Sequence, residues 1–165
     1  KEEGFMEAYR IQVFLHIVAV VVAFGITFAF PFMIAFAEKN GVAATRFALK
    51  FTDRVDKMVV TPGAVIVGLL GVGLIFDDNT GYKDDFPVWL VVAIVWYVGA
   101  VGVSQTIMRS NTRASIRALE GVPDDAELPA AYRALAKQAS IIGGLLGLSV
   151  VGITFMMVWG SRGGF

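Results

Sequence analysis

The fold is decided by the segment IQVFLHIVAVVVAFGITFAFPFMIAFA, residues 11–37, which contains no Asp, Glu, Lys or Arg. Three later segments share this property, at residues 58–76, 86–108 and 139–159. Each is close to or above the ~20 residues that a helix needs to cross a hydrocarbon core of roughly 30 Å. Because lipid cannot bond to backbone N–H and C=O groups, helix is the conformation that satisfies them. We therefore predict an all-α fold, a four-helix transmembrane bundle.

The composition is typical of a membrane protein, with 56% of the residues hydrophobic and 17% charged. We expect a single integral membrane domain over residues 1–165, because the four apolar segments fill more than half of the chain. The first segment is too long for a signal-peptide core and follows an acidic start, so we interpret it as a retained helix. The formal net charge is zero, which gives no indication of a nucleic-acid partner.

The distribution of basic residues predicts the orientation. Residues 38–57 and residues 109–138 carry five Lys or Arg each, whereas residues 77–85 carry one Lys and four Asp. Cytoplasmic loops hold the excess of basic residues. We therefore expect a multi-pass protein of the bacterial plasma membrane, with both termini outside and the first and third connections cytoplasmic.

The first connection is expected to form an amphipathic helix. Its apolar residues recur at helical spacing: Val42, Phe47, Phe51, Val55 and Met58. This helix is predicted to lie in the headgroup layer or to pack under the bundle. Its basic residues are expected to face lipid headgroups, and plain solvation of the same side chains is the alternative. They are Arg46, Lys50, Arg54 and Lys57.

The third connection is expected to form a helical hairpin in the cytoplasm. The third helix is predicted to continue past Met108 and to stop at Gly121-Val122-Pro123. Pro129 is then expected in the first turn of the fourth helix, because proline is tolerated there.

Small residues indicate where the helices approach one another, since association in lipid depends on close fit. The candidates for helix packing include Gly25, Gly68, Gly143 and Gly147. We expect packing within the chain, with a dimerisation face as the alternative. Pro31 cannot donate to the carbonyl of Thr27, so a kink is predicted there, with Thr27 offering partial repair.

His16 is the only histidine of the chain and lies inside the first predicted span. Ionisable residues in a membrane are costly, so such a residue raises a functional hypothesis. A neutral imidazole could ligate haem iron, with Met156 or Met157 as the second ligand. The alternative is a structural histidine that bonds across the bundle, with Gln12 as a polar neighbour.

Catalytic patterns are absent from the sequence. The four predicted spans contain no Asp, Glu, Lys or Arg for a proton or ion relay, which argues against a pump. The chain has no Cys and no cluster of residues with the ligand count of a catalytic metal site. The sequence thus leans against an enzyme without settling the question.

The first helix resembles that of several bacterial four-helix membrane families. The residues that carry the resemblance are Phe14-Leu15-His16-Ile17-Val18-Ala19-Val20, then Phe24-Gly25 and Phe30-Pro31. Nearly the whole chain resembles a family of predicted bacterial integral membrane proteins of unknown function. More remotely it is similar to the copper-resistance D membrane domain and to bacterial membrane protoporphyrinogen oxidase. In the oxidase family a first-helix histidine that resembles His16 is implicated in haem binding, but that family's functional lysine has no counterpart here.

Three functions follow as expectations. The leading one is a non-catalytic accessory or assembly subunit, embedded in the lipid bilayer, that packs against a larger membrane complex or forms a homo-oligomer. The second is a haem-binding redox or haem-handling protein that uses His16. The third is a transporter of an apolar or lipid-like small molecule, because such a substrate needs no charged relay.

Overall fold

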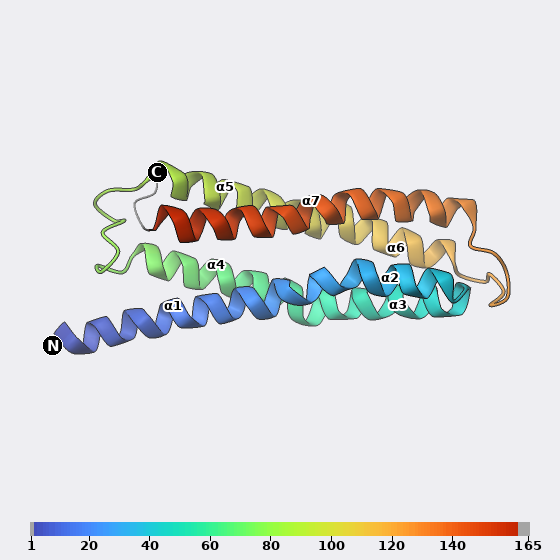
Figure 1. Cartoon of the computed structure of the whole chain (residues 1–165), viewed down its shortest axis with the longest axis horizontal. Coiled ribbons are helices and arrows are strands. Elements are labelled where there is room, and N and C mark those ends of the chain that lie inside the picture. The colour runs from blue at the N-terminus through green and yellow to red at the C-terminus, as the bar shows by residue number, and fades with distance from the viewer. Residues whose placement is uncertain (1, 162–165) are drawn as a thin grey trace.

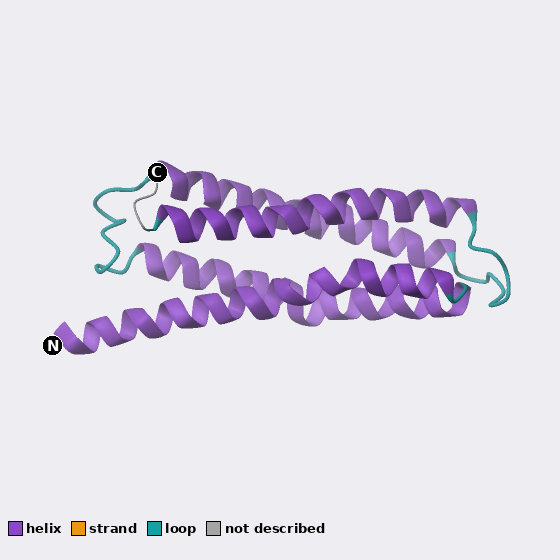
Figure 2. Ribbon diagram, in the orientation of Figure 1, coloured by secondary structure: helices purple, strands orange, loops and turns teal. Residues whose placement is uncertain are grey.

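The structure is a computed structural model that describes residues 2–161. Within this range it consists of four long helices that run antiparallel to their neighbours in sequence, joined by turns and loops (Figures 1 and 2). All four are long and apolar enough to cross a membrane. The predicted four-helix transmembrane bundle is thus confirmed.

Three of the four helices change their local geometry along their length. The first comprises α1 (Glu2–Gly25), the 3-10 turn η1 (Ile26–Ala29) and α2 (Phe30–Lys39). The second comprises α3 (Val42–Val55), the π-helical turn η2 (Asp56–Val60) and α4 (Thr61–Ile75). The third comprises α5 (Val88–Val103), the π-helical turn η3 (Ser104–Met108) and α6 (Arg109–Ala118). The fourth is α7 (Ala130–Gly160) alone.

Two helix pairs form the bundle. The first helix packs along the second, with α1 on α4 and α2 on α3. The fourth packs along the third, so that α7 contacts both α5 and α6, and α3 joins the two pairs through α6. The acidic loop between α4 and α5 lies at the same end as the start of α1 and the end of α7 (Figure 1). We call the opposite end, formed by residues 30–57 and 109–138, the basic end.

The basic end holds a conventional hydrophobic core. Its buried residues are Val42, Leu49, Leu119 and Tyr132, with Ile34, Ile116, Val122 and Leu128 among the side chains packed around them. Tyr132 is 1% exposed, and its hydroxyl donates to Glu38 at 2.7 Å. By contrast, the apolar halves of the helices expose many large hydrophobic side chains, as expected of surfaces that face lipid. The basic end is therefore built like a water-soluble bundle.

The helix predicted in the first connection is present, but it does not lie flat. Because α3 and α4 belong to one continuous helix, α3 extends the second span outward along nearly the same line (Figure 1). Only part of the predicted apolar stripe packs against other helices, because Phe47, Phe51 and Met58 are exposed. Smaller residues form the buried face, where α2 and α6 approach: Val42, Thr45, Ala48, Leu49 and Thr52. Small side chains permit that approach, and this displaces the bulky phenylalanines to the outside.

The helix ends follow local chemistry. Pro31 is the second residue of α2 and cannot donate to the carbonyl of Thr27. The N–H of Phe30, just before it, bonds to that carbonyl instead, so a tighter turn satisfies it. The Thr27 hydroxyl donates instead to the Phe24 carbonyl at 2.6 Å. The predicted repair at Thr27 is therefore made by the backbone of Phe30.

The predicted hairpin is present at the basic end, with α6 ending at Ala118 and α7 beginning directly after Pro129. Pro129 thus precedes the first turn rather than lying in it. Arg46 from α3 braces this connection by donating to the carbonyls of Leu119 at 3.0 Å and Val122 at 2.6 Å. It also pairs with Asp124 at 3.1 Å.

Candidate functional site

Four exposed phenylalanines lie on the outside of the basic end. Phe32 and Phe36 are one helical turn apart on α2, and their exposed fractions are 78% and 71%. Phe47 and Phe51 are one turn apart on α3, exposed by 71% and 45%, with their ring centroids 6.3 Å apart. Because α2 packs on α3, both pairs belong to the same helix pair. We refer to them below as the four phenylalanines.

The register of the first helix against the second fixes their depth. A Cβ on Gly63 would meet Ala23 at 2.6 Å, and one on Gly71 would meet the His16 ring at 3.3 Å. The two helices run antiparallel, so the numbers of facing residues add up to about 86 in each pair. By this rule, residue 28 of the first helix lies level with Met58, the first residue of the second apolar segment.

From that level the four phenylalanines extend outward. At 1.5 Å per residue, Phe32 lies about 6 Å and Phe36 about 12 Å past the level of Met58, although both belong to the first apolar segment, residues 11–37. By the same rise, Phe51 lies about 10 Å and Phe47 about 16 Å past that level. The headgroup region adds only roughly 5–7 Å on each side of the hydrocarbon. Measured from the end of the second apolar segment, Phe36, Phe47 and Phe51 thus lie farther out than the headgroup region extends. Exposed aromatic surface at that level is unfavourable unless another surface covers it.

Basic side chains lie among the four phenylalanines. Lys50, between Phe47 and Phe51 in sequence, is exposed and makes no ion pair among the described residues. Arg54 bonds only weakly, to the sulfur of Met58. The other predicted headgroup ligands have internal partners, because Arg46 braces the hairpin and Lys57 pairs with Asp53.

A second polar arrangement joins the two π-helical turns. In each turn a backbone N–H reaches back five residues, from Thr61 to Asp56 and from Arg109 to Ser104. Pro62 accounts for the first turn, because it has no N–H for the carbonyl of Met58. In the second, the hydroxyl of Thr106 donates to the Gly102 carbonyl at 2.7 Å and competes with the regular backbone bond.

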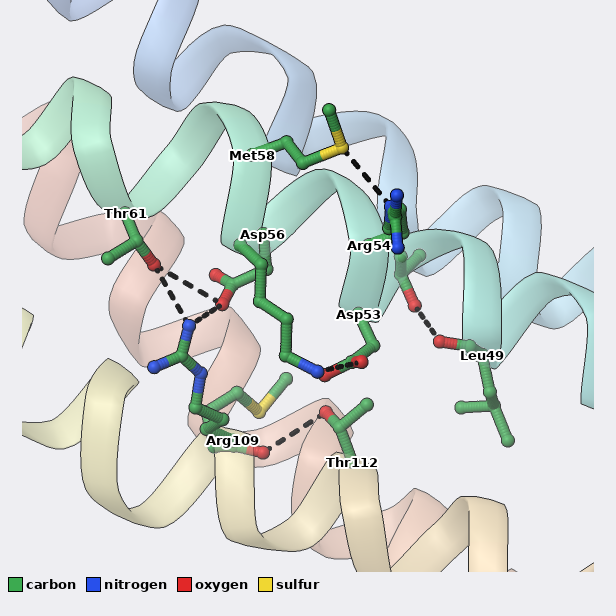
Figure 3. Close-up of polar contacts among 11 residues, drawn as sticks. Leu49, Asp53, Arg54, Asp56, Met58, Thr61, Arg109 and Thr112 are labelled. Carbon is green, nitrogen blue, oxygen red and sulfur yellow. Dashed lines mark hydrogen bonds and ion pairs between the residues drawn. The ribbon is translucent and has the colours of Figure 1, made fainter.

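The side chains of these turns form a cluster that links the second and third helices (Figure 3). Arg109 lies 3.4 Å from the Asp56 carboxylate and donates to the Thr61 hydroxyl at 3.3 Å. The Gln105 amide donates to the same hydroxyl at 3.1 Å. We call Asp56, Thr61, Gln105 and Arg109 the Arg109 cluster.

The Arg109 cluster is suited to holding two helices together. The side chains of Arg109 and Asp56 are 23% and 24% exposed, so each charge needs the other. The Nε atom of Arg109 is buried and has no hydrogen-bond partner. The Thr61 hydroxyl also donates to the Asp56 carboxylate at 3.5 Å. No group of three His, Cys, Asp or Glu in the described range could hold a metal ion.

His16 lies at the interface between α1 and α4. Its ring fills the space left by Gly71, and one turn earlier Gln12 donates to the Leu70 carbonyl at 3.3 Å and occupies the space above Gly73. The Nδ1 atom of His16 is buried and has no hydrogen-bond partner. Met156 and Met157 lie on α7, which packs on α5 rather than along α1.

The glycines singled out for helix packing have different surroundings. A Cβ on Gly68 would touch the ring of Tyr97 at 3.6 Å, whose hydroxyl donates to the Ala64 carbonyl. Gly143 lies against Met108, and Gly147 lies against Phe28. Gly25 has open space around it.

Sequence reasoning missed the two most distinctive arrangements. Thr61 and Gln105 are 44 residues apart, so no local pattern connects them. The exposure of Phe47 and Phe51 was missed because their helical spacing is the same whether the stripe faces inward or outward. A usable indication was the Pro62-Gly63 pair just inside the second span, which marks a disturbed helix.

Comparison with known proteins gives one match. The family model described as predicted integral membrane protein (DUF2269) matches residues 11–160. No curated protein and no solved structure matches the chain. The match supports the resemblance to predicted integral membrane proteins, and it does not extend to the copper-resistance D domain or to protoporphyrinogen oxidase.

Proposed function

We propose that this chain, which belongs to the DUF2269 family of predicted integral membrane proteins, is a non-catalytic accessory or assembly subunit of a larger membrane complex. The observation that supports this role is the exposure of Phe36, Phe47 and Phe51 beyond the level at which the second apolar segment ends. Water would contact these side chains in an isolated protein, whereas a partner protein would bury them.

The chemistry of the surface indicates the kind of partner. Each phenylalanine offers on the order of 150–250 Å² of surface for burial, which is typical of an anchor in an interface. Lys50 and Arg54 beside them favour carboxylates on the partner. The partner is thus a membrane protein whose cytoplasmic part presents an apolar surface rimmed by Asp or Glu.

The proposed orientation places the basic end in the cytoplasm of a bacterial plasma membrane. Both connections rich in Lys and Arg lie at that end, and the acidic loop lies at the other (Figure 1). The acidic loop is held by Lys83, which donates to Asp78 at 2.6 Å and lowers the pKa of that carboxyl.

Photo-crosslinking in native membranes tests the proposed role. A benzophenone amino acid is placed at Phe36, at Phe47 or, as the control, at Leu145, whose exposed side chain lies in an apolar segment. We expect a discrete protein adduct from positions 36 and 47 and none from position 145. An adduct with the mass of two copies of this chain would show that the surface binds a second copy of the chain rather than a different partner. No protein adduct at positions 36 and 47 would contradict the proposal.

Haem binding is the second candidate, and the unpartnered Nδ1 of His16 favours it. Against it, the imidazole is packed against Gly71, and both methionines lie on a helix that packs on α5. An absorption spectrum of the protein purified in mild detergent tests it, alongside His16→Ala. A Soret band that the variant loses would support the haem role, and a colourless protein with full helicity would leave His16 structural.

A further inference from the structure

A hollow of about 290 Å³ lies along one face of the third helix, at the π-helical turn η3. Its lining is entirely polar or basic: Gln105, Thr106, Arg109, Ser110, Arg113 and Arg117. We call it the arginine groove. All six residues come from one helix, where they recur at spacings of one, three or four. The groove is separate from the four phenylalanines, which lie on α2 and α3.

The arginines of this groove differ in their partners. Arg109 is held by Asp56 and Thr61, so its position is fixed. Arg113 and Arg117 are exposed, and neither makes an ion pair or hydrogen bond within residues 2–161. The Ser110 hydroxyl, also exposed, lies among them. The groove thus gathers positive charge and hydrogen-bond donors with a single carboxylate, Asp56, in contact.

The depth of the groove matches that of lipid phosphates. Met108 is the last residue of the third apolar segment. At 1.5 Å per residue, Arg113 lies about 7 Å beyond it and Arg117 about 14 Å. The headgroup region extends roughly 5–7 Å beyond the hydrocarbon. Arg113 is therefore level with the phosphate groups. Arg117 lies farther out, on the aqueous side of them.

The same helix continues into the apolar segment, where the surface around Gly99 and Gly102 is open, and we call this surface the trough. Gly99 and Gly102 have open space where a side chain would lie. Val95 and Val98 beside them are exposed by 66% and 62%. These positions belong to the helix that carries the groove and lie within three turns of it, toward the middle of the apolar segment. A lipid whose phosphate lies in the groove can place an acyl chain in the trough.

We propose that the arginine groove binds the phosphate of an anionic phospholipid, with Arg113 and Arg117 as its ligands and the Gly99–Gly102 trough as the seat of an acyl chain. The guanidinium group suits this role, because its N–H groups form paired hydrogen bonds with phosphate oxygens. Arg109, tied to Asp56, positions the groove rather than donating freely to the ligand. This proposal does not depend on the accessory role proposed above.

Native mass spectrometry of the delipidated protein tests the proposal, with phosphatidylglycerol and phosphatidylcholine as the two lipids. We expect tighter binding of phosphatidylglycerol. The double variant R113Q/R117Q is expected to weaken that binding on the order of thirtyfold, from the usual contribution of two arginines near an anionic surface. The control R133Q/K137Q removes the same charge from the same connection outside the groove and is expected to change it less than about twofold.

Two further arms separate the features of the site. Gly102→Leu fills the trough without changing charge, and we expect it to weaken phosphatidylglycerol binding as well. Inorganic phosphate and glycerol phosphate are expected not to displace the lipid, because neither has an acyl chain. Circular dichroism shows whether each variant keeps its helicity.

Several outcomes would overturn the proposal. Equal binding of both lipids would exclude recognition of an anionic headgroup. An equal loss in both double variants would show general electrostatic attraction instead of a groove. Displacement by inorganic phosphate, together with unchanged binding in Gly102→Leu, would reassign the groove to a soluble phosphate compound.

Discussion

Arg109 on the third helix donates to the hydroxyl of Thr61 on the second at 3.3 Å, and each residue directly follows a π-helical turn. The two disturbed turns are thus joined by the polar groups beside them. If either π-helical turn were regular α-helix, the side chain of Thr61 or Arg109 that follows it would point in a different direction. The Arg109 cluster and the widened turns therefore depend on each other.

Arg109→Leu tests this dependence. We expect it to lower the free energy of unfolding by about 1–2 kcal/mol, because it leaves Asp56 and Thr61 without their partner in a half-buried place. The measurement is loss of helicity in mixed detergent micelles. Arg133→Leu is the matched control, since Arg133 pairs with Glu127 at 3.5 Å on an exposed surface, and its expected effect is under about 0.5 kcal/mol. Equal losses of stability in Arg109→Leu and Arg133→Leu would contradict a structural role of the Arg109 cluster.

Gly63→Ala tests the close approach of the first two helices. A Cβ at this position would lie 2.6 Å from the Cβ of Ala23, so one helix must shift. We expect a loss of about 1–3 kcal/mol in the same unfolding assay. Gly144→Ala, which adds a methyl group where nothing lies within 4 Å, serves as the control. The second change Ala23→Gly should restore part of the stability, and failure to do so would argue against this contact.

Tyr132→Phe tests the polar bond inside the core of the basic end. The phenol is buried and donates to Glu38 at 2.7 Å. Removing the hydroxyl should cost about 1–3 kcal/mol, because it leaves a carboxylate in a sheltered place without its donor. Tyr82→Phe, in the loop between α4 and α5, is expected to have little effect. A Tyr132→Phe protein as stable as the original would mean that water replaces the phenol.

The orientation is open to a direct test, because the chain contains no Cys. A single Cys at Asn79 marks the acidic loop, and one at Asp125 marks the basic hairpin. We expect a membrane-impermeant thiol reagent applied to intact cells to label position 79 and not position 125. Labelling of position 125 alone would invert the proposed orientation.

The four spans and the hairpin could be predicted because they depend on local composition. Uninterrupted apolar residues fix the spans, and Gly121 and Pro129 mark the ends of the two helices that they separate. The φ angle of Gly121 is +73°, a conformation that glycine adopts without strain.

The remaining features could not be predicted because they depend on contacts between distant segments. Asp56 and Arg109 look like ordinary charges at the ends of apolar segments until the fold brings them within 3.4 Å. The outward face of Phe47 was likewise decided by the small residues Thr45 and Ala48, which α2 and α6 require at close range. In both cases the contacts with other helices determine which face is buried, and helical periodicity alone does not distinguish the two faces.

The turn at Gly41 also bears on biogenesis. Its φ angle of +94° reverses the chain between Lys39 and Val42, so the first two helices are joined almost without a loop. The ribosome completes this pair before it begins the third helix, and the pair already holds the matched contacts of Ala23 with Gly63 and His16 with Gly71. The first two helices can thus enter the bilayer together as a preassembled hairpin, and the second pair docks onto a surface that already exists.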